Sequence, residues 1–107
     1  EDTDDQEVLL ATLEELSRDL FAAISEEKMA FRTVTVKIRY HDFFTRSKAR
    51  STELYRRDIR TILSLSRELF TELYSGEKVR LLGLRISTLK GDVSGQKKID
   101  DFLDGSS

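Results

Sequence analysis

The sequence predicts a small α+β domain, in which an antiparallel sheet carries two helices on one face. Residues 32–40 and 79–89 alternate between apolar side chains and basic or hydroxyl ones, which is typical of strands with one buried face. Residues 5–25 and 58–74 instead repeat their apolar side chains at the spacing of amphipathic helices. The 107 residues are enough for one domain with a modest core.

The first helix is expected over residues 5–25. A hydroxyl and two carboxylates at residues 3–5 can cap its amino terminus and suit the positive end of its dipole. Four leucines recur at i, i+4, i+7 and i+11, namely Leu9, Leu13, Leu16 and Leu20. This spacing places them on one side of the helix, toward the core.

The first strand is expected over residues 32–40, with Val34, Val36 and Ile38 pointing to the core. Residues 44–51 are interpreted as a polar edge strand that pairs with the first, because basic side chains on an edge discourage unwanted association. A second helix over residues 58–74 is predicted to end at Gly76 in the left-handed conformation.

The last strand, residues 79–89, has Leu82, Leu84 and Ile86 on its inner side. Its outer side carries Arg85 and Ser87, and Gly83 leaves a bare patch of backbone that another molecule could approach closely. The order of elements is therefore helix, strand, strand, helix, strand, with one sheet face left to solvent or to a ligand.

The charge is distributed unevenly along the chain. The net charge is −2, but residues 1–28 have a net charge of −8 and residues 29–95 a net charge of +7. Cations and hydroxyls on neighbouring strands suit a polyanion, and no aromatic side chain is expected to point outward from the alternating strands, so duplex backbone is the favoured target. The predicted phosphate contacts are Thr35, Lys37, Arg39, Arg46, Lys48, Arg50, Arg85 and Ser87.

Catalytic and metal-binding constellations are not found in the sequence. The chain has no cysteine and one histidine, and it has no glycine-rich phosphate loop. Asp42 beside His41 is typical of turn chemistry, and the adjacent Asp100 and Asp101 are poorly placed to share a metal. We expect no catalysis, no metal and no cofactor in this domain. Because no signal peptide and no 18-residue apolar span is found, we also expect a cytoplasmic protein without a membrane partner.

The carboxy-terminal segment is divided into a linker, residues 90–95, and a tail, residues 96–107, after a domain of residues 1–89. One turn of helix in the tail would place an amide and three apolar side chains on one side, namely Gln96, Ile99, Phe102 and Leu103. Such a turn could fill an apolar pocket of a partner. The alternative is an ordinary helix that packs on its own domain.

Three segments, TVTVKIRYHDF, FTRSKARST and VRLLGLRIS, occur in this order with one helix between the last two. They resemble the little finger (polymerase-associated) domain of Y-family DNA polymerases, in particular the archaeal members of the DinB/DNA polymerase IV branch. The resemblance covers residues 7–89, and the tail resembles the motif by which replication proteins dock on the sliding clamp PCNA.

The resemblance implies a domain that grips the template–primer duplex during translesion synthesis and DNA repair. The polymerase active site and its Mg²⁺ would then belong to other parts of the parent chain, so this fragment alone would not be an enzyme. The family fold is β-α-β-β-α-β with sheet order 1-4-2-3, and its first strand is missing here, which together with the absent initiator Met indicates a fragment. The edge of residues 79–89 would then be unpaired and open to self-association.

Two other functions remain open from the residues alone. The chain could be a protein-interaction module that acts through its sheet edge or its tail. It could also bind structured RNA in place of duplex DNA. Salt dependence separates the first alternative from phosphate binding, and competition between duplex DNA and duplex RNA separates the second.

Overall fold

The computed structural model describes residues 3–91 of the chain and confirms the predicted α+β class. The elements follow one another as α1 (Gln6–Glu26), β1 (Met29–Tyr40), β2 (Thr45–Arg56), α2 (Ile59–Leu73), β3 (Val79–Ser87) and β4 (Lys90–Gly91). In this part of the chain, neither helix is long and apolar enough to cross a membrane.

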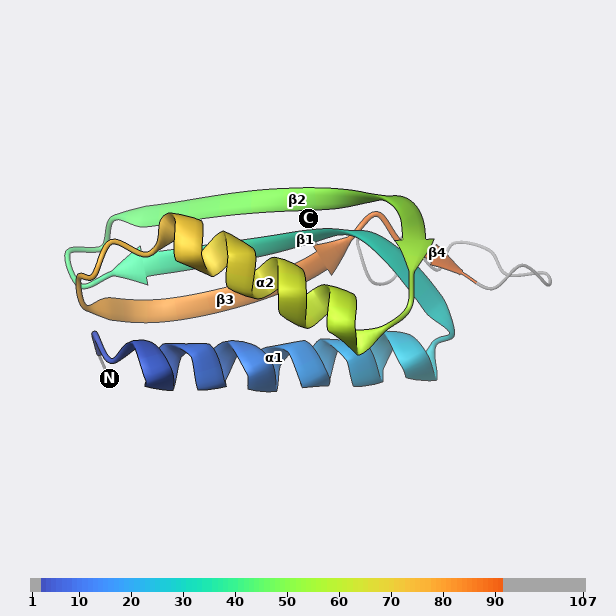
Figure 1. Ribbon diagram of the computed structural model, residues 1–107, viewed down its shortest axis with the longest axis horizontal. Helices are drawn as coiled ribbons and strands as arrows, with labels where there is room; N and C mark the ends of the chain where they lie inside the picture. Colours follow the sequence, from blue (N-terminus) through green and yellow to red (C-terminus); the bar gives the residue numbers. More distant parts are fainter. Residues whose placement is uncertain (1–2, 92–107) are drawn as a thin grey trace.

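The sheet is antiparallel, with β1 in the centre, β2 on one side and β3 on the other. Figure 1 shows both helices on the same side of this sheet, with α2 in front of the strands and α1 running alongside β3. Among residues 3–91, no helix covers the remaining sheet face (Figure 1). Lys90 and Gly91, assigned from the sequence to the linker, form β4 and pair with Ala30 and Met29 at the start of β1. Two residues of the predicted linker therefore take part in the sheet.

The core lies between the sheet and the helices. Val34, Val36 and Ile38 of β1 are completely buried, as their alternation predicted. On α1, Leu9 and Leu13 are buried, whereas Leu16 and Leu20 are only partly covered. The difference arises because α1 packs mainly along β3 and α2, so that only part of the leucine stripe meets the core.

Both helices begin at an aspartate. The Asp5 carboxylate accepts hydrogen bonds from the Glu7 and Val8 amides at the start of α1, and Asp58 serves α2 in the same way. Gly76 has a positive φ of 93°, but α2 already ends at Leu73, so the prediction that Gly76 terminates the helix is wrong. This glycine instead allows the turn that leads into β3.

The outer edge of β3 is paired at one end. The Thr3 and Val79 backbones exchange two hydrogen bonds, of 3.1 Å and 2.7 Å, as an isolated antiparallel bridge. Among residues 3–91, no strand lies beside the rest of this edge, residues 80–87. This part of β3 is therefore an edge strand in the described part of the chain.

The edge strand β2 runs further than predicted and contains an irregularity. Phe31 pairs with Arg56 but Thr33 pairs with Ser51, so residues 52–55 form a bulge in β2. Two apolar side chains stand out in this bulge, Leu54 with 72% and Tyr55 with 40% of its surface exposed. The alternation in residues 44–51 gave no sign of this extension.

Candidate nucleic-acid interface

The face of the sheet opposite the helices is polar and uncovered, and we call it the open sheet face. Its members follow from the register, because directly paired residues of neighbouring strands point to the same side. They are Thr33, Thr35, Lys37 and Arg39 of β1, Thr45, Ser47, Ala49 and Ser51 of β2, and Leu81, Gly83, Arg85 and Ser87 of β3. None of these side chains is acidic.

Three cations stand on this face, on two adjacent strands. Lys37 and Arg39 follow each other on the outer side of β1, and Arg85 is paired with Thr35 on β3. All three are exposed, and Arg39 Nε donates a hydrogen bond of 3.2 Å to Thr45 Oγ1. These placements agree with the predictions for the two alternating strands.

A shallow depression of ≈ 480 Å³ opens around Lys37, with Thr35, Ser47, Gly83 and Arg85 among its lining residues. A side chain at position 83 would not clash with its neighbours. A Cβ atom added at Gly83 would come no closer than 3.9 Å to its neighbours, which is ordinary van der Waals contact. What the missing side chain provides is room on the sheet surface beside a lysine.

Hydroxyl groups occupy the far end of the open sheet face. Thr33 Oγ1 lies 2.8 Å from Ser51 Oγ and 2.8 Å from Thr88 Oγ1, within hydrogen-bonding distance of both. Ser87 is paired with Thr33 on the same face, as predicted for Ser87. The sequence analysis did not single out Thr45, Ser47 or Ser51 of β2, because only the pairing register shows that these hydroxyls share a face with Lys37.

Arg46, Lys48 and Arg50, which were predicted as phosphate contacts, do not lie on this face. They are paired with Ile38, Val36 and Val34, whose side chains point to the core, so the three cations lie on the helical side of the sheet. The alternation of β2 was recognised correctly. Since both sides of this edge strand are polar, however, the pattern could not show which set of side chains faces which side.

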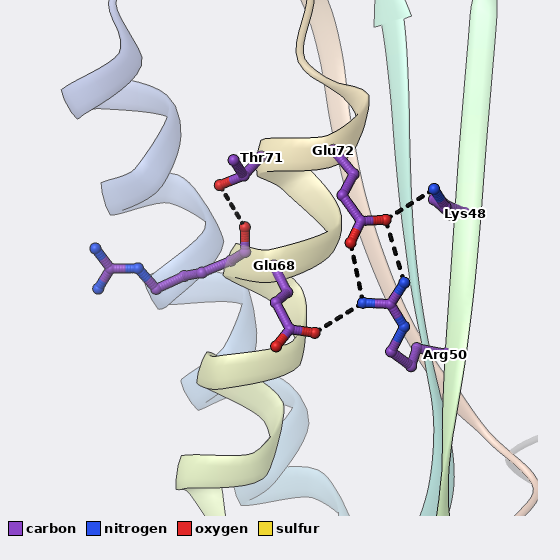
Figure 2. A network of polar contacts seen from close by, with 6 residues as sticks. Lys48, Arg50, Glu68, Thr71 and Glu72 are labelled. Atoms are coloured by element: carbon purple, nitrogen blue, oxygen red, sulfur yellow. Dashed lines mark hydrogen bonds and ion pairs between the residues drawn. The ribbon is translucent and has the colours of Figure 1, made fainter.

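Two of these three cations are held by α2, as Figure 2 shows. Lys48 Nζ lies 2.7 Å from a carboxylate oxygen of Glu72. The Arg50 guanidinium binds Glu68 at 2.7 Å and Glu72 at 3.1 Å. These contacts join the edge strand to the helical layer and leave the open sheet face to Lys37, Arg39 and Arg85.

The network also changes the acidity of its members. Hydrogen bonds from Arg50 and then from Lys48 lower the pKa of Glu72 to about 2. Conversely, the hydrogen bonds to Glu72 and Glu68 raise the pKa of Arg50 above its ordinary value. Glu72 and Arg50 are therefore both charged over the physiological range, which keeps Arg50 paired to α2.

Other predicted sites lie outside this face. Gln96, Ile99, Phe102 and Leu103 fall outside the described residues. Within residues 3–91, no group of three or more His, Cys, Asp or Glu side chains is arranged to hold a metal ion. The fold and the site thus define a small α+β domain whose exposed sheet face is basic and rich in hydroxyls.

The chain belongs to the impB/mucB/samB family, because residues 1–100 match the model of its C-terminal domain. This is the little finger domain of Y-family polymerases, so the resemblance stated from the sequence is confirmed.

Two relatives carry the name DNA polymerase IV. The chain is 39% identical to DNA polymerase IV of Methanoculleus marisnigri, over 95% of this chain and 28% of that protein. It is 33% identical to DNA polymerase IV of Methanosarcina acetivorans, again over 95% of this chain and 28% of that protein. The chain thus spans under a third of these relatives.

One solved structure supports the fold. It is described as a complex of the beta-clamp processivity factor and the little finger domain of PolIV. The match has a TM-score of 0.65 and 21% sequence identity, and it covers 92% of this chain and 88% of that chain. At this identity, the likeness concerns the fold alone.

Proposed function

We propose that this chain is the duplex-DNA-binding domain of a Y-family translesion polymerase of the DNA polymerase IV type, and that it grips template–primer through the phosphate backbone. The observation that carries the proposal is the gathering of Lys37, Arg39 and Arg85 on an uncovered sheet face without acidic side chains. Cations on a rigid surface attract phosphates whatever the base sequence.

The proposed contact set is smaller than the one derived from the sequence. Lys37, Arg39 and Arg85 would pair with phosphates, and the nearby hydroxyls of Thr35 and Ser87 would donate hydrogen bonds to phosphate oxygens. Arg46, Lys48 and Arg50 are left out because they lie on the helical side of the sheet. Binding Lys48 or Arg50 to DNA would also require breaking their ion pairs with α2.

The proposal is tested by measuring the affinity for unrelated duplexes at several salt concentrations. The double variant Arg39→Ala/Arg85→Ala should bind all duplexes more weakly and to a similar extent. The slope of log K against log[salt] should become less steep by about 0.9 for each lost contact. A sequence-selective loss would show that bases, not phosphates, are recognised.

The matched control is the variant Arg18→Ala/Arg46→Ala, which removes the same charge from the helical side of the molecule. This control should keep most of the affinity and of the salt slope. Equal losses in the two double variants would mean that net charge, and not the open sheet face, determines binding. Tighter binding of duplex RNA would favour the structured-RNA alternative, and salt-independent binding of a protein would favour the interaction module.

We further propose that Gln96, Ile99, Phe102 and Leu103 dock on a sliding clamp such as PCNA. The support is the spacing of these residues in the sequence and the description of the related solved structure, in which a little finger domain is in complex with a clamp. An interface of this size is expected to bind in the micromolar range, or about −8 kcal/mol.

Titration of a sliding clamp with the wild-type chain and with Phe102→Ala tests the docking proposal. The variant should bind at least about tenfold more weakly, because aromatic anchors commonly dominate small interfaces. Asp104→Ala, which removes a nearby polar side chain, serves as the control. If Phe102→Ala lowers the melting temperature and neither protein binds the clamp, the tail packs on its own domain instead.

We assign nucleotidyl transfer, and the Mg²⁺ that it requires, to parts of the parent polymerase outside this chain. As part of the same proposal, we expect the parent protein to be cytoplasmic. The length of the named relatives supports this division, since they are more than three times as long as this chain.

A further inference from the structure

The turn between β1 and β2 exposes two aromatic side chains, and we call residues 41–44 the hairpin tip. Phe43 has 63% and Phe44 has 61% of its surface exposed. Adjacent phenylalanines this open to water are unusual on a small domain, whose large apolar side chains are mostly buried. Core packing does not account for them.

The hairpin tip is held in one conformation. Phe43 has a φ of 70°, in the left-handed region that a bulky side chain rarely adopts. Its amide donates to Tyr40 O at 2.8 Å, the Phe44 amide donates to Asp42 Oδ1 at 3.0 Å, and the Tyr40 amide donates to Phe44 O at 2.9 Å. The His41 amide donates to Lys78 O at 3.0 Å, which fastens the tip to the segment before β3. A costly backbone conformation that is fixed in this way is a recurrent feature of functional sites.

Cations surround the aromatic pair. The Arg80 guanidinium carbon lies 4.5 Å from the centre of the Phe43 ring. Thr45, the residue after Phe44, is bound by Arg39 of the open sheet face. The nearest carboxylate in sequence, Asp42, accepts the Phe44 amide and so is engaged within the turn. The tip therefore continues the basic open sheet face with an apolar, aromatic end.

We propose that the hairpin tip stacks on an unpaired nucleobase of single-stranded DNA next to the duplex that the open sheet face binds. This inference rests on the proposed function and specifies what lies beyond one end of the bound duplex. Aromatic rings stack on any base, whereas bases inside a duplex already have both faces covered by their neighbours. A free face is offered only by an unpaired base or by the last base pair.

Continuity with the open sheet face favours a nucleic acid as the occupant of this tip. Arg39 of that face donates a hydrogen bond to Thr45, the residue directly after Phe44. A strand that runs on from a duplex bound to the open sheet face would therefore bring its next unpaired base to the two rings. Burial of the tip in an apolar pocket of a protein is the competing outcome of the test.

The second exposed apolar pair does not offer the same chemistry. Arg32 and Lys90 lie 5.7 Å and 5.3 Å from the centre of the Tyr55 ring, so two cations already share that ring. Leu54, with 72% exposure, has no aromatic face. This makes Leu54 a suitable control, because it is even more exposed than the phenylalanines and lies on the same hairpin.

The experiment compares the affinity of the chain for three DNAs: a blunt hairpin duplex, the same duplex with a short single-stranded overhang, and the same overhang with abasic sites. Wild type should bind the natural overhang more tightly than the other two DNAs. Phe43→Ala and Phe44→Ala should reduce this gain, by about tenfold per lost base stack, and leave the affinity for the blunt duplex unchanged. Leu54→Ala should bind all three DNAs as wild type does.

Further variants keep the test decisive if an alanine variant is unstable. Phe43→Leu retains apolar bulk without a π face, so it should also lose the gain, whereas Phe43→Tyr should keep it. A wild-type gain of equal size on the abasic overhang would overturn the inference, since phosphates alone would then explain it. Overhang binding by Phe43→Leu at the wild-type level would overturn it as well. Failure of wild type to bind the blunt duplex would instead refute the proposed function of the open sheet face.

Discussion

Glu72 is the residue that joins the helical layer to the edge of the sheet. Its carboxylate binds Lys48 and Arg50 at once, and Glu68 supplies a second acceptor to Arg50 one helical turn earlier. Exposed ion pairs contribute little to stability singly, but this network fixes two long basic side chains in place. Its importance is therefore to determine which cations remain available for a polyanion.

The acidity of Glu72 gives the first prediction. Its pKa in the folded protein is about 2, below the ordinary 4.5, so the folded protein binds this proton more weakly than the unfolded chain does. The stabilisation is complete above pH 4.5 and is lost as the pH falls toward 2. Titration of the side-chain carboxyls by NMR should show Glu72 still ionised at pH 3.5, and denaturant midpoints should fall in the same range.

Two variants of β2 test whether Arg50 causes the low pKa of Glu72. Arg50→Gln should raise the pKa of Glu72 toward its ordinary value, because Arg50 is the largest cause of the shift. Arg46→Gln removes a charge from the same side of the same strand, and it should leave the Glu72 titration almost unchanged. An unchanged Glu72 pKa in Arg50→Gln would contradict the contacts in Figure 2.

At the scale of the elements, the start of α2 depends on one carboxylate. Asp58 accepts the Thr61 amide at 3.0 Å and the Arg56 Nε at 3.2 Å. Burial alone would raise its pKa, but the hydrogen bonds from Thr61 and Arg56 together lower it. Asp58→Ala should reduce the free energy of unfolding by about 1 kcal/mol in urea denaturation, as is usual for the loss of an N-cap.

Asp19→Ala, an exposed change inside α1, provides the comparison for the cap. Alanine favours helix interiors, so this variant should be as stable as wild type or slightly more stable. Equal effects of the two substitutions would mean that Asp58 acts only through its charge. Both substitutions remove one carboxylate, so a difference in their free energies of unfolding reports the loss of the cap and not the loss of charge.

The strands differ in how far the sequence determines them. In β1 one side is wholly apolar, so the alternation of Val34, Val36 and Ile38 fixed both the strand and its orientation. In β2 the two sides are both polar, and only pairing with β1 shows that Arg46 faces the helical layer. The bulge at residues 52–55 was missed for a similar reason, since no periodic pattern continues through it. The sequence therefore identified the candidate cations and gave the faces of those on β1 and β3, but it could not assign a face to the cations of β2.

The free edge of β3 gives the next prediction. In the described part of the chain, no strand pairs with the outer edge of residues 80–87. Leu81, within this segment, has 47% of its surface exposed. We expect this chain to self-associate in a concentration-dependent manner through this edge. Sedimentation should detect the association, and Leu81→Lys should weaken it, because a lysine opposes edge-to-edge pairing.

Leu54→Lys places the same charge at an exposed position of β2, away from that edge, and should leave the association unchanged. Addition of an upstream segment that pairs with β3 should favour the monomer and raise the melting temperature. If the chain sediments as a monomer at all concentrations, with or without this extension, the edge is already protected and the prediction is wrong.

At the scale of the whole molecule, the layers differ in charge. The acidic first part of the chain forms α1, and Glu68 and Glu72 of α2 form ion pairs with Lys48 and Arg50 on the helical side. Lys37, Arg39 and Arg85 remain on the opposite face. Such a separation orients the domain in the field of a polyanion, so that the open sheet face approaches first.

The same distribution of charge bears on catalysis and leads to the last prediction. Two-metal nucleotidyl transfer needs several carboxylates converging on one site. Within residues 3–91, no group of three or more His, Cys, Asp or Glu side chains is arranged to hold a metal ion. Several carboxylates are engaged elsewhere, as helix caps, as ion-pair partners of Arg18, Lys48 and Arg50, or in the hairpin turn. We therefore expect no primer extension by the purified chain with template–primer, nucleotides and Mg²⁺.

Arg39→Ala/Arg85→Ala serves as the control for contamination. An extension activity of this chain should fall in this variant, because duplex binding falls. The activity of a contaminating polymerase should not change. Extension by wild type that is lost in this variant would show that the chain itself holds an active site.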